Sequence, residues 1–267
     1  MSRPRGFTLV EAIIALTLAV MVGALSLKLL LGQQRLARLE AARVETQLTL
    51  HAGLNYLVRE FRPLAGGADL LDAGSDALTF RATRGFGLVC DLSGSSLLVA
   101  DSDRYGTRLP VAGRDSLLLF RAGDSTTHSD DRWVPAAIIS VASRTGCGGR
   151  PTLALSVSAD SGALEPLAIR FPAPIRIYEI VQVRAYLSDG LTWLGARSVS
   201  AGESIQPVFG PLAVGGLRLS YFDPAGLLTL DRSRVRSIGI TLIAQPAVGL
   251  ARDSLSTRVL IRNSTAR

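Results

Sequence analysis

The chain has 267 residues, of which 48% are hydrophobic and 19% charged, and this composition argues against a disordered protein. Its length allows one large or two small domains with a sizeable core. The formal net charge is +7, but the basic residues are dispersed along the chain, which favours an ordinary solvated surface over a nucleic-acid or other anionic partner.

An apolar segment from Phe7 to Leu31 follows two arginines, Arg3 and Arg5. As a helix this segment is about 37 Å long at 1.5 Å per residue, enough to span a bilayer with some tilt. The arginines predict a cytoplasmic N-terminus, with the rest of the chain outside the cytoplasm. Glu11 interrupts the start of the segment, and a charge at membrane depth is costly and usually functional. We therefore treat Glu11 as a candidate functional residue.

The helical pattern continues beyond the membrane segment. Residues 32–62 are rich in helix formers, and one face carries Leu50, Leu54, Leu57 and Phe61. The sequence therefore predicts one nearly continuous helix over residues 7–62, roughly 84 Å long, with an apolar first half and an amphipathic second half. The alternative, a cleaved secretory signal peptide, needs neither so long an apolar run nor this extension.

The stretch "RGFTLVEAIIAL", residues 5–16, closely resembles the class III signal of type IV pilins and of the pseudopilins of type II secretion. The resemblance implies that residues 1–6 are a leader peptide and that a prepilin peptidase cuts between Gly6 and Phe7. The same enzyme would then N-methylate Phe7. It also implies assembly with other minor and major pilins or pseudopilins on an inner-membrane platform.

In such an assembly, Glu11 becomes the fifth residue of the processed chain and can face the amino group of Phe7 in a neighbouring subunit. At 4 Å and an effective dielectric constant near 20, the two charges attract by about 4 kcal/mol before desolvation is subtracted. Pairing would reward the correct stagger between subunits. The alternative is a solvated glutamate at the membrane interface.

Residues 63–267 are predicted to form a β-rich head, because Gly, Asp and Ser separate short apolar runs. The orientation of the membrane segment places this head outside the cytoplasm. The expected fold class is α+β and type IV pilin-like, with a long N-terminal helix packed on an antiparallel sheet. The predicted strands cover residues 77–82, 87–92, 96–101, 116–122, 134–143, 152–158, 179–188, 216–223, 237–245 and 256–262, with a turn at Asp189–Gly190. Stretches such as "GLRLSYFDPAG" and "VRSIGITLIAQ" look like the PilW and pseudopilin J group of larger minor subunits.

The two cysteines, Cys90 and Cys147, lie far apart and lack metal-ligand spacing. Because thiols oxidise outside the cytoplasm, a disulfide between them is the natural expectation, and two buried free thiols are the alternative.

Sequence motifs for hydrolases, metalloproteases and nucleotide binding are missing, so we expect no enzyme, no cofactor and no metal. His51 and His128 are expected in surface or packing roles. Residues 101–106 and 123–131 only faintly resemble calcium-binding loops. Arg232, Arg234 and Arg236 could touch DNA phosphates, although a solvated turn near residues 235–237 is favoured.

These observations predict a minor pilin or pseudopilin that sits in the inner membrane and then joins or primes the tip of a type IV pilus or type II pseudopilus. A head of some 200 residues is large for a subunit that packs in many copies, which favours the tip. The alternative is a pilus-associated binding subunit whose head captures DNA, a surface or a secreted substrate.

Overall fold

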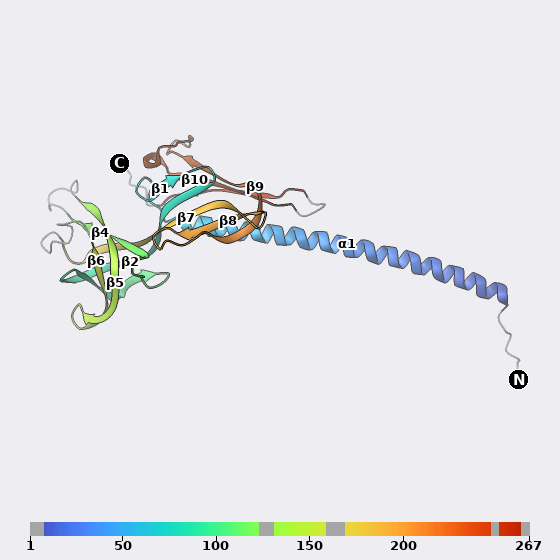
Figure 1. Cartoon of the computed structure of the whole chain (residues 1–267), viewed down its shortest axis with the longest axis horizontal. Helices are drawn as coiled ribbons and strands as arrows, with labels where there is room; N and C mark the ends of the chain where they lie inside the picture. The colour runs from blue at the N-terminus through green and yellow to red at the C-terminus, as the bar shows by residue number, and fades with distance from the viewer. Residues whose placement is uncertain (1–7, 123–130, 159–168, 247–250, 263–267) are drawn as a thin grey trace.

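The computed structural model of the chain describes residues 8–122, 131–158, 169–246 and 251–262. A single long helix, α1, projects from a β-rich head (Figure 1). The 3₁₀ helix η2 (Arg232–Arg234) separates the ninth strand from the tenth. The strands described are β1 (Leu70–Ala73), β2 (Ala77–Ser93), β3 (Ser96–Gly106), β4 (Asp115–Arg121), β5 (Arg132–Gly146), β6 (Arg150–Ser158), β7 (Ala173–Ser188), β8 (Leu191–Ser198), β9 (Gln206–Phe222), β10 (Ser237–Ala244) and β11 (Ser254–Leu260).

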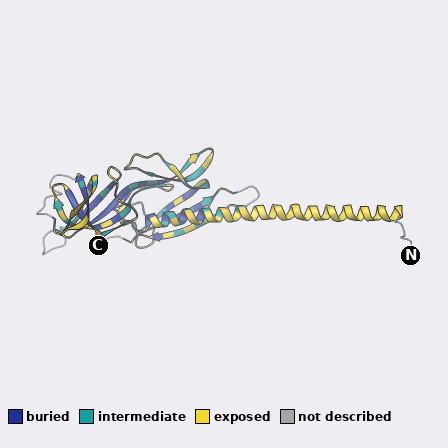
Figure 2. Cartoon of the chain, turned by 90° about the horizontal axis from the view of Figure 1, so that it is seen from below, coloured by how far each residue is buried: buried dark blue, intermediate teal, exposed yellow. Residues whose placement is uncertain are grey.

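Helix α1 (Leu9–Phe61) is one element of 53 residues, about 80 Å long. It ends just before Pro63, whose ring cannot continue a helix. Every residue from Thr8 to Ala41 is exposed, whereas the C-terminal turns are inserted into the head (Figure 2). A chain that begins at Gln33 therefore keeps every side chain that the head buries, and we expect it to fold on its own.

Six of the described strands close into a barrel. Going round the ring, β2 pairs with β3, then come β6, β5, β4 and β7, and β7 pairs again with β2. All of these pairings are antiparallel. The interior is filled by aliphatic side chains that alternate with outward-facing residues along the strands, including Val99, Leu117, Ile138, Leu155 and Ile175. We call this part, residues 85–177, the barrel lobe.

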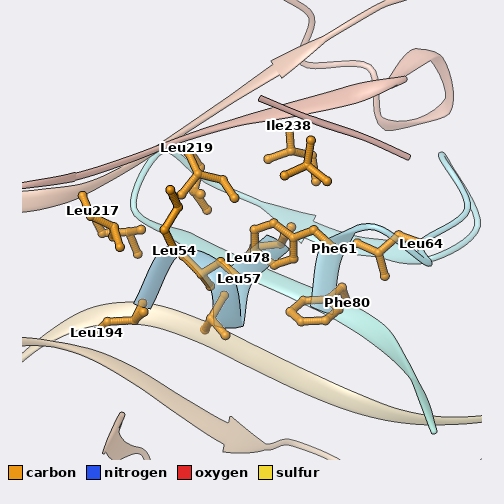
Figure 3. Close-up of a cluster of buried hydrophobic side chains, with 14 of the residues drawn as sticks. Leu54, Leu57, Phe61, Leu64, Leu78, Phe80, Leu194, Leu217, Leu219 and Ile238 are labelled. Atoms are coloured by element: carbon orange, nitrogen blue, oxygen red, sulfur yellow. The ribbon is translucent and has the colours of Figure 1, made fainter. Parts of the chain in front are cut away.

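The remaining strands form an open antiparallel sheet that packs on α1. It runs β1–β2–β7–β8–β9–β10–β11 and uses the first half of β2 and the second half of β7. One face of this sheet covers the predicted apolar stripe of α1, so that Leu57 and Phe61 are fully buried (Figure 3). Phe61 meets Phe80 of β2 edge to face, with ring centroids 5.3 Å apart. We call this part the sheet lobe.

Strands β2 and β7 run through both lobes and join them at a waist. The register between them shifts between Thr83 and Gly85, at the point where β2 leaves the sheet lobe. A Cβ at Gly85 would lie 2.8 Å from the carbonyl oxygen of Tyr105, so this close approach of β2 and β3 requires glycine.

The α+β architecture agrees with the prediction, and the turn at Asp189–Gly190 joins β7 to β8 as expected. The predicted strands 77–82 and 87–92 are instead one strand, β2, because Gly85 allows the backbone to bend without breaking the ladder. The closure of half the head into a barrel was not predicted.

Candidate assembly site

The first turn of α1 holds a capping box. Thr8 is the N-cap, and its hydroxyl accepts the backbone N–H of Glu11 at 3.3 Å. The Glu11 carboxylate oxygen Oε2 accepts the backbone N–H of Thr8 at 3.2 Å and the Thr8 hydroxyl at 3.1 Å. Gly6 and Phe7, the predicted cleavage and methylation residues, lie outside the described residues.

Glu11 thus has a role within its own chain that the sequence reasoning missed, although the pattern Thr8-x-x-Glu11 is the usual signal for it. The cap holds the carboxylate at the N-terminal end of the helix, where an acidic side chain stabilises the first turn. Phe7, whose amino group the expected cut would free, directly precedes the cap. A neighbouring subunit would therefore meet a carboxylate that is already fixed in place.

The segment that follows is predominantly apolar. Among the described residues, α1 is the helix long and apolar enough to cross a membrane: an 18-residue window has a mean hydropathy of 2.3 and none of it is buried. Side chains in this segment, such as Leu16 and Val20, are exposed and are not covered by the head. This arrangement suits single-pass anchoring in the inner membrane.

Residues 1–27 match a family described as the prokaryotic N-terminal methylation motif. The chain therefore carries the N-terminal signal of type IV pilins and pseudopilins. The motif implies processing by prepilin peptidase and assembly with other pilins. No curated protein and no solved structure matches the chain.

At the C-terminal end of α1, inside the head, a cluster of charged side chains ties the helix to both lobes. Arg84 of β2 donates to Glu60 of α1 at 2.9 Å and to Glu179 of β7 at 2.8 Å. Arg114, which precedes β4, donates to Glu179 at 2.7 Å. Arg108 donates to the same carboxylate at 3.2 Å. We call this set, together with Asp115, which pairs with Arg108, the waist cluster.

Glu179, at the centre of the waist cluster, has a lowered pKa although its side chain is almost completely buried. Burial alone would raise the pKa of Glu179, but hydrogen bonds from Ser198 and Arg84 and the nearby guanidinium charges outweigh it, so its pKa is lowered. Burial disfavours the charged form of Arg84, yet the attraction of Glu60 and the hydrogen bond to Glu179 raise its pKa. The sequence signal for this cluster was a charge inside the apolar strand "IRIYEIV", residues 175–181.

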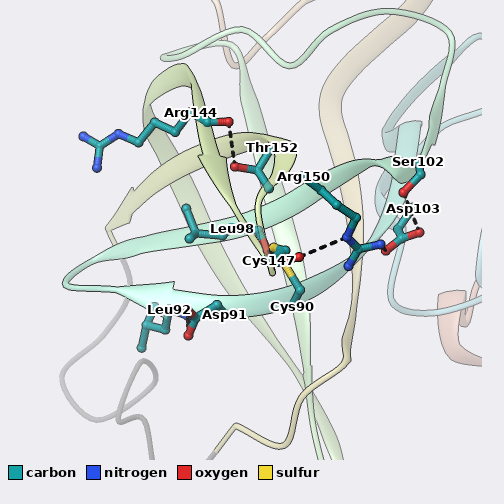
Figure 4. Close-up of a disulfide and its surroundings, with 10 residues drawn as sticks. All are labelled: Cys90, Asp91, Leu92, Leu98, Ser102, Asp103, Arg144, Cys147, Arg150 and Thr152. Atoms are coloured by element: carbon teal, nitrogen blue, oxygen red, sulfur yellow. Dashed lines mark hydrogen bonds and ion pairs between the residues drawn. A yellow bond between two sulfur atoms is a disulfide. The ribbon is translucent and has the colours of Figure 1, made fainter.

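A disulfide joins Cys90 to Cys147, with the two Cα atoms 5.8 Å apart (Figure 4). Cys90 lies in β2, and Cys147 lies in the turn between β5 and β6. In the barrel, β3 and β6 separate β2 from β5, so the bond fastens this turn across the outside of β3. The disulfide belongs to the barrel lobe alone.

Those remaining sequence candidates that the structure describes are not gathered into a site; residues 123–130 of the other calcium-loop candidate lie outside the described ranges. His51 is exposed on α1, while His128 lies outside the described residues. Residues 101–106 belong to β3, where Asp103 pairs with Arg150 at 3.3 Å. Within the described ranges, no three His, Cys, Asp or Glu side chains are grouped in a way that could hold a metal ion.

The arginine run 232–236 is largely used inside the chain. Arg232 donates to the carbonyl oxygens of Leu70, at 3.2 Å, and Leu71, and Arg234 donates to Asp223 at 2.9 Å. Arg232 and Arg234 themselves form the ends of η2, and the expected break before the next strand falls at Val235 and Arg236, since β10 begins at Ser237. These arginines fasten the segment before β10 to the rest of the sheet lobe.

Proposed function

We propose that this protein is a minor pilin or pseudopilin that joins or primes the tip of a type IV pilus or type II pseudopilus. Residues 1–6 are removed as a leader, residues 7–31 cross the inner membrane from a cytoplasmic N-terminus, residues 32–62 connect to the head, and residues 63–267 form the head. The observation that carries the proposal is an exposed helix with an apolar membrane-length window whose N-terminal part lies within the matched methylation motif. The proposal assigns no catalysis.

In this mechanism α1 moves from lipid into a bundle of similar helices, so its apolar surface stays out of water throughout. Glu11 is then the one carboxylate in the segment 7–31 that must find a partner. The amino group of Phe7 in a neighbouring subunit supplies the opposite charge, and leaving either charge unpaired in an apolar bundle costs several kcal/mol. Correct stagger is thereby favoured over wrong stagger.

The test is Glu11→Gln in the native host. Glutamine can keep the capping box, so the substitution removes the charge and preserves the first turn. We expect filament formation or secretion to fall severely, whereas Glu40→Gln, an exposed carboxylate on the same helix outside the membrane segment, leaves both unchanged. Mass spectrometry should find a processed chain beginning at methylated Phe7. Normal assembly by Glu11→Gln, or an intact Met1, would contradict the proposal.

A second candidate, capture of DNA, a surface or a secreted substrate by the head, gains support from the barrel lobe, which has its own core apart from the helix-packing sheet. Deleting the gene separates the two candidates. If the protein primes assembly, the deletion should abolish the filaments. If it captures a ligand, the filaments should still form but fail in uptake, adhesion or secretion.

A further inference from the structure

The loop between β9 and η2 presents leucine side chains to solvent. Leu227 is 66% exposed, Leu228 73% and Leu230 93%. Scattered exposed leucines are ordinary, but three within four residues on one loop are a concentrated apolar surface. We call residues 224–230 the leucine loop.

The leucine loop is fixed in this outward position. Asp223, which is 5% exposed, accepts the backbone N–H groups of Ala225 at 2.9 Å and Leu227 at 3.0 Å. The Thr229 N–H donates to the Tyr221 carbonyl at 2.9 Å, which ties the loop to β9. Gly226 supplies the positive φ of +82° that the turn needs. The exposure of the leucines is therefore built into the loop.

A groove of about 240 Å³ runs beside the loop. Leu228 and Leu230 line one side of it, and Gly74 and Ser75 in the turn between β1 and β2 line the other. The groove has room for an apolar side chain of a partner, so the loop and groove together offer both a projection and a recess.

Charges of both signs flank this surface. Arg232 and Arg234 lie on the η2 side, and Arg234 is exposed. Asp72 and Asp76 lie on the other side, near enough to Tyr221 to raise its pKa in addition to the larger effect of burial. An anionic lipid surface would be attracted by one side and repelled by the other, whereas a protein can match both.

The position of the loop also excludes the protein's own membrane as its partner. Gly67, just after α1, lies against Ser233 of η2, where an added Cβ would be 3.1 Å from the Ser233 Cα. The loop thus sits beside the end of α1 that is inserted in the head. From Leu31, the last residue of the membrane segment, to Arg62 the helix rises about 45 Å. The leucine loop therefore lies well beyond the membrane segment along the helix, out of reach of the lipid.

We infer that the leucine loop and its groove dock the head of a different subunit that carries the same N-terminal signal. The partner is expected to present an apolar patch with acidic groups opposite η2 and basic groups opposite the β1–β2 turn. A second copy fits less well, because the processed chain keeps a formal charge of +5, the +7 of the whole chain less Arg3 and Arg5. The inference rests on the proposed assembly function.

The experiment places a photo-crosslinking amino acid at Leu230 of the full chain in the native host. Val214, which is 89% exposed in β9, is the matched control. Irradiation should link position 230, and not position 214, to one protein whose own sequence begins with a prepilin-type signal. An adduct with lipid, with a second copy or with a protein lacking that signal would overturn the inference, as would the absence of an adduct.

A double substitution, Leu228→Ser with Leu230→Ser, supplies the functional readout. Losing two central apolar contacts should lower filament formation or secretion about tenfold or more, while Val214→Ser has no effect. Because both leucines are exposed, the thermal stability of the chain beginning at Gln33 should not fall. If Glu11→Gln blocks assembly but the leucine variant assembles normally, the docking inference fails and the proposed function stands. If Glu11→Gln also assembles normally, the proposed function itself fails.

Discussion

The two lobes of the head bury their apolar side chains in different ways. The sheet lobe is open, so one apolar face of its strands must be covered, and the last turns of α1 cover it. The barrel lobe closes on itself, and its strands cover one another without the helix. The apolar side chains of α1 pack on the sheet lobe alone, so changes in the core of the barrel lobe should leave the packing of the helix unchanged.

The waist shows how the two lobes are joined. Strands β2 and β7 are continuous through both, so the barrel is an insertion between them rather than a domain on a flexible linker. The waist cluster then fixes the insertion to the end of α1 through Glu60 and Glu179. We therefore expect a core substitution in one lobe to increase local unfolding mainly in that lobe. The following variants of the chain beginning at Gln33 test this expectation.

The largest expected effect comes from the disulfide. Replacing Cys90 and Cys147 by serine frees a loop closed over a sequence separation of 57, which should lower the free energy of unfolding by about 4 kcal/mol in the chain-entropy account. Denaturant unfolding measures the loss. Hydrogen exchange should rise in β3, β5 and β6 and stay low in residues 50–61. An equal rise in hydrogen exchange in both lobes would contradict the expectation that the two lobes unfold locally and separately.

Leu57→Ala tests the sheet lobe. Leu57 is fully buried between the helix and the sheet, so its truncation should lower the free energy of unfolding by about 3 kcal/mol. Leu48→Ala, on the exposed side of the same helix, should change it by less than about 0.5 kcal/mol. Hydrogen exchange should now rise first in α1 and β8–β10, the reverse of the disulfide variant.

The smallest effect concerns the waist and depends on pH. The folded-state pKa of Glu179 is lowered, so its contribution to stability is complete above the unfolded glutamate value of about 4.3 and is lost as pH falls through the lower folded value. Glu179→Gln should be less stable than the parent chain at pH 7, because Arg84 loses a partner, and should lose less on acidification from pH 5 to pH 3.

The control for this prediction is Glu40→Gln, which is exposed and should follow the parent chain. Thermal unfolding scans across this pH range provide the measurement. If the unfolding temperatures of Glu179→Gln and the parent chain fall equally between pH 5 and pH 3, Glu179 does not contribute to the pH dependence of stability.

Local patterns predicted much of the architecture. The helix, the stripe of Leu50, Leu54, Leu57 and Phe61 and most strand positions follow from hydrophobic periodicity, which is a property of neighbouring residues. The buried charges were harder to predict. Glu179 interrupts an apolar strand visibly, but its partners Arg84 and Arg114 lie 95 and 65 residues away in the sequence.

The amino-acid sequence by itself determined the processing signal, the apolar anchor and the long helix, because each depends on residues within a few turns of one another. Tertiary structure alone decided that the described strands between residues 85 and 177 close into a barrel and that three arginines and three acids from the helix, the strands and a loop meet at the waist. It also decided that the leucine loop is held exposed to solvent. Strand partners and surface exposure depend on contacts between distant segments, and no local pattern specifies those contacts.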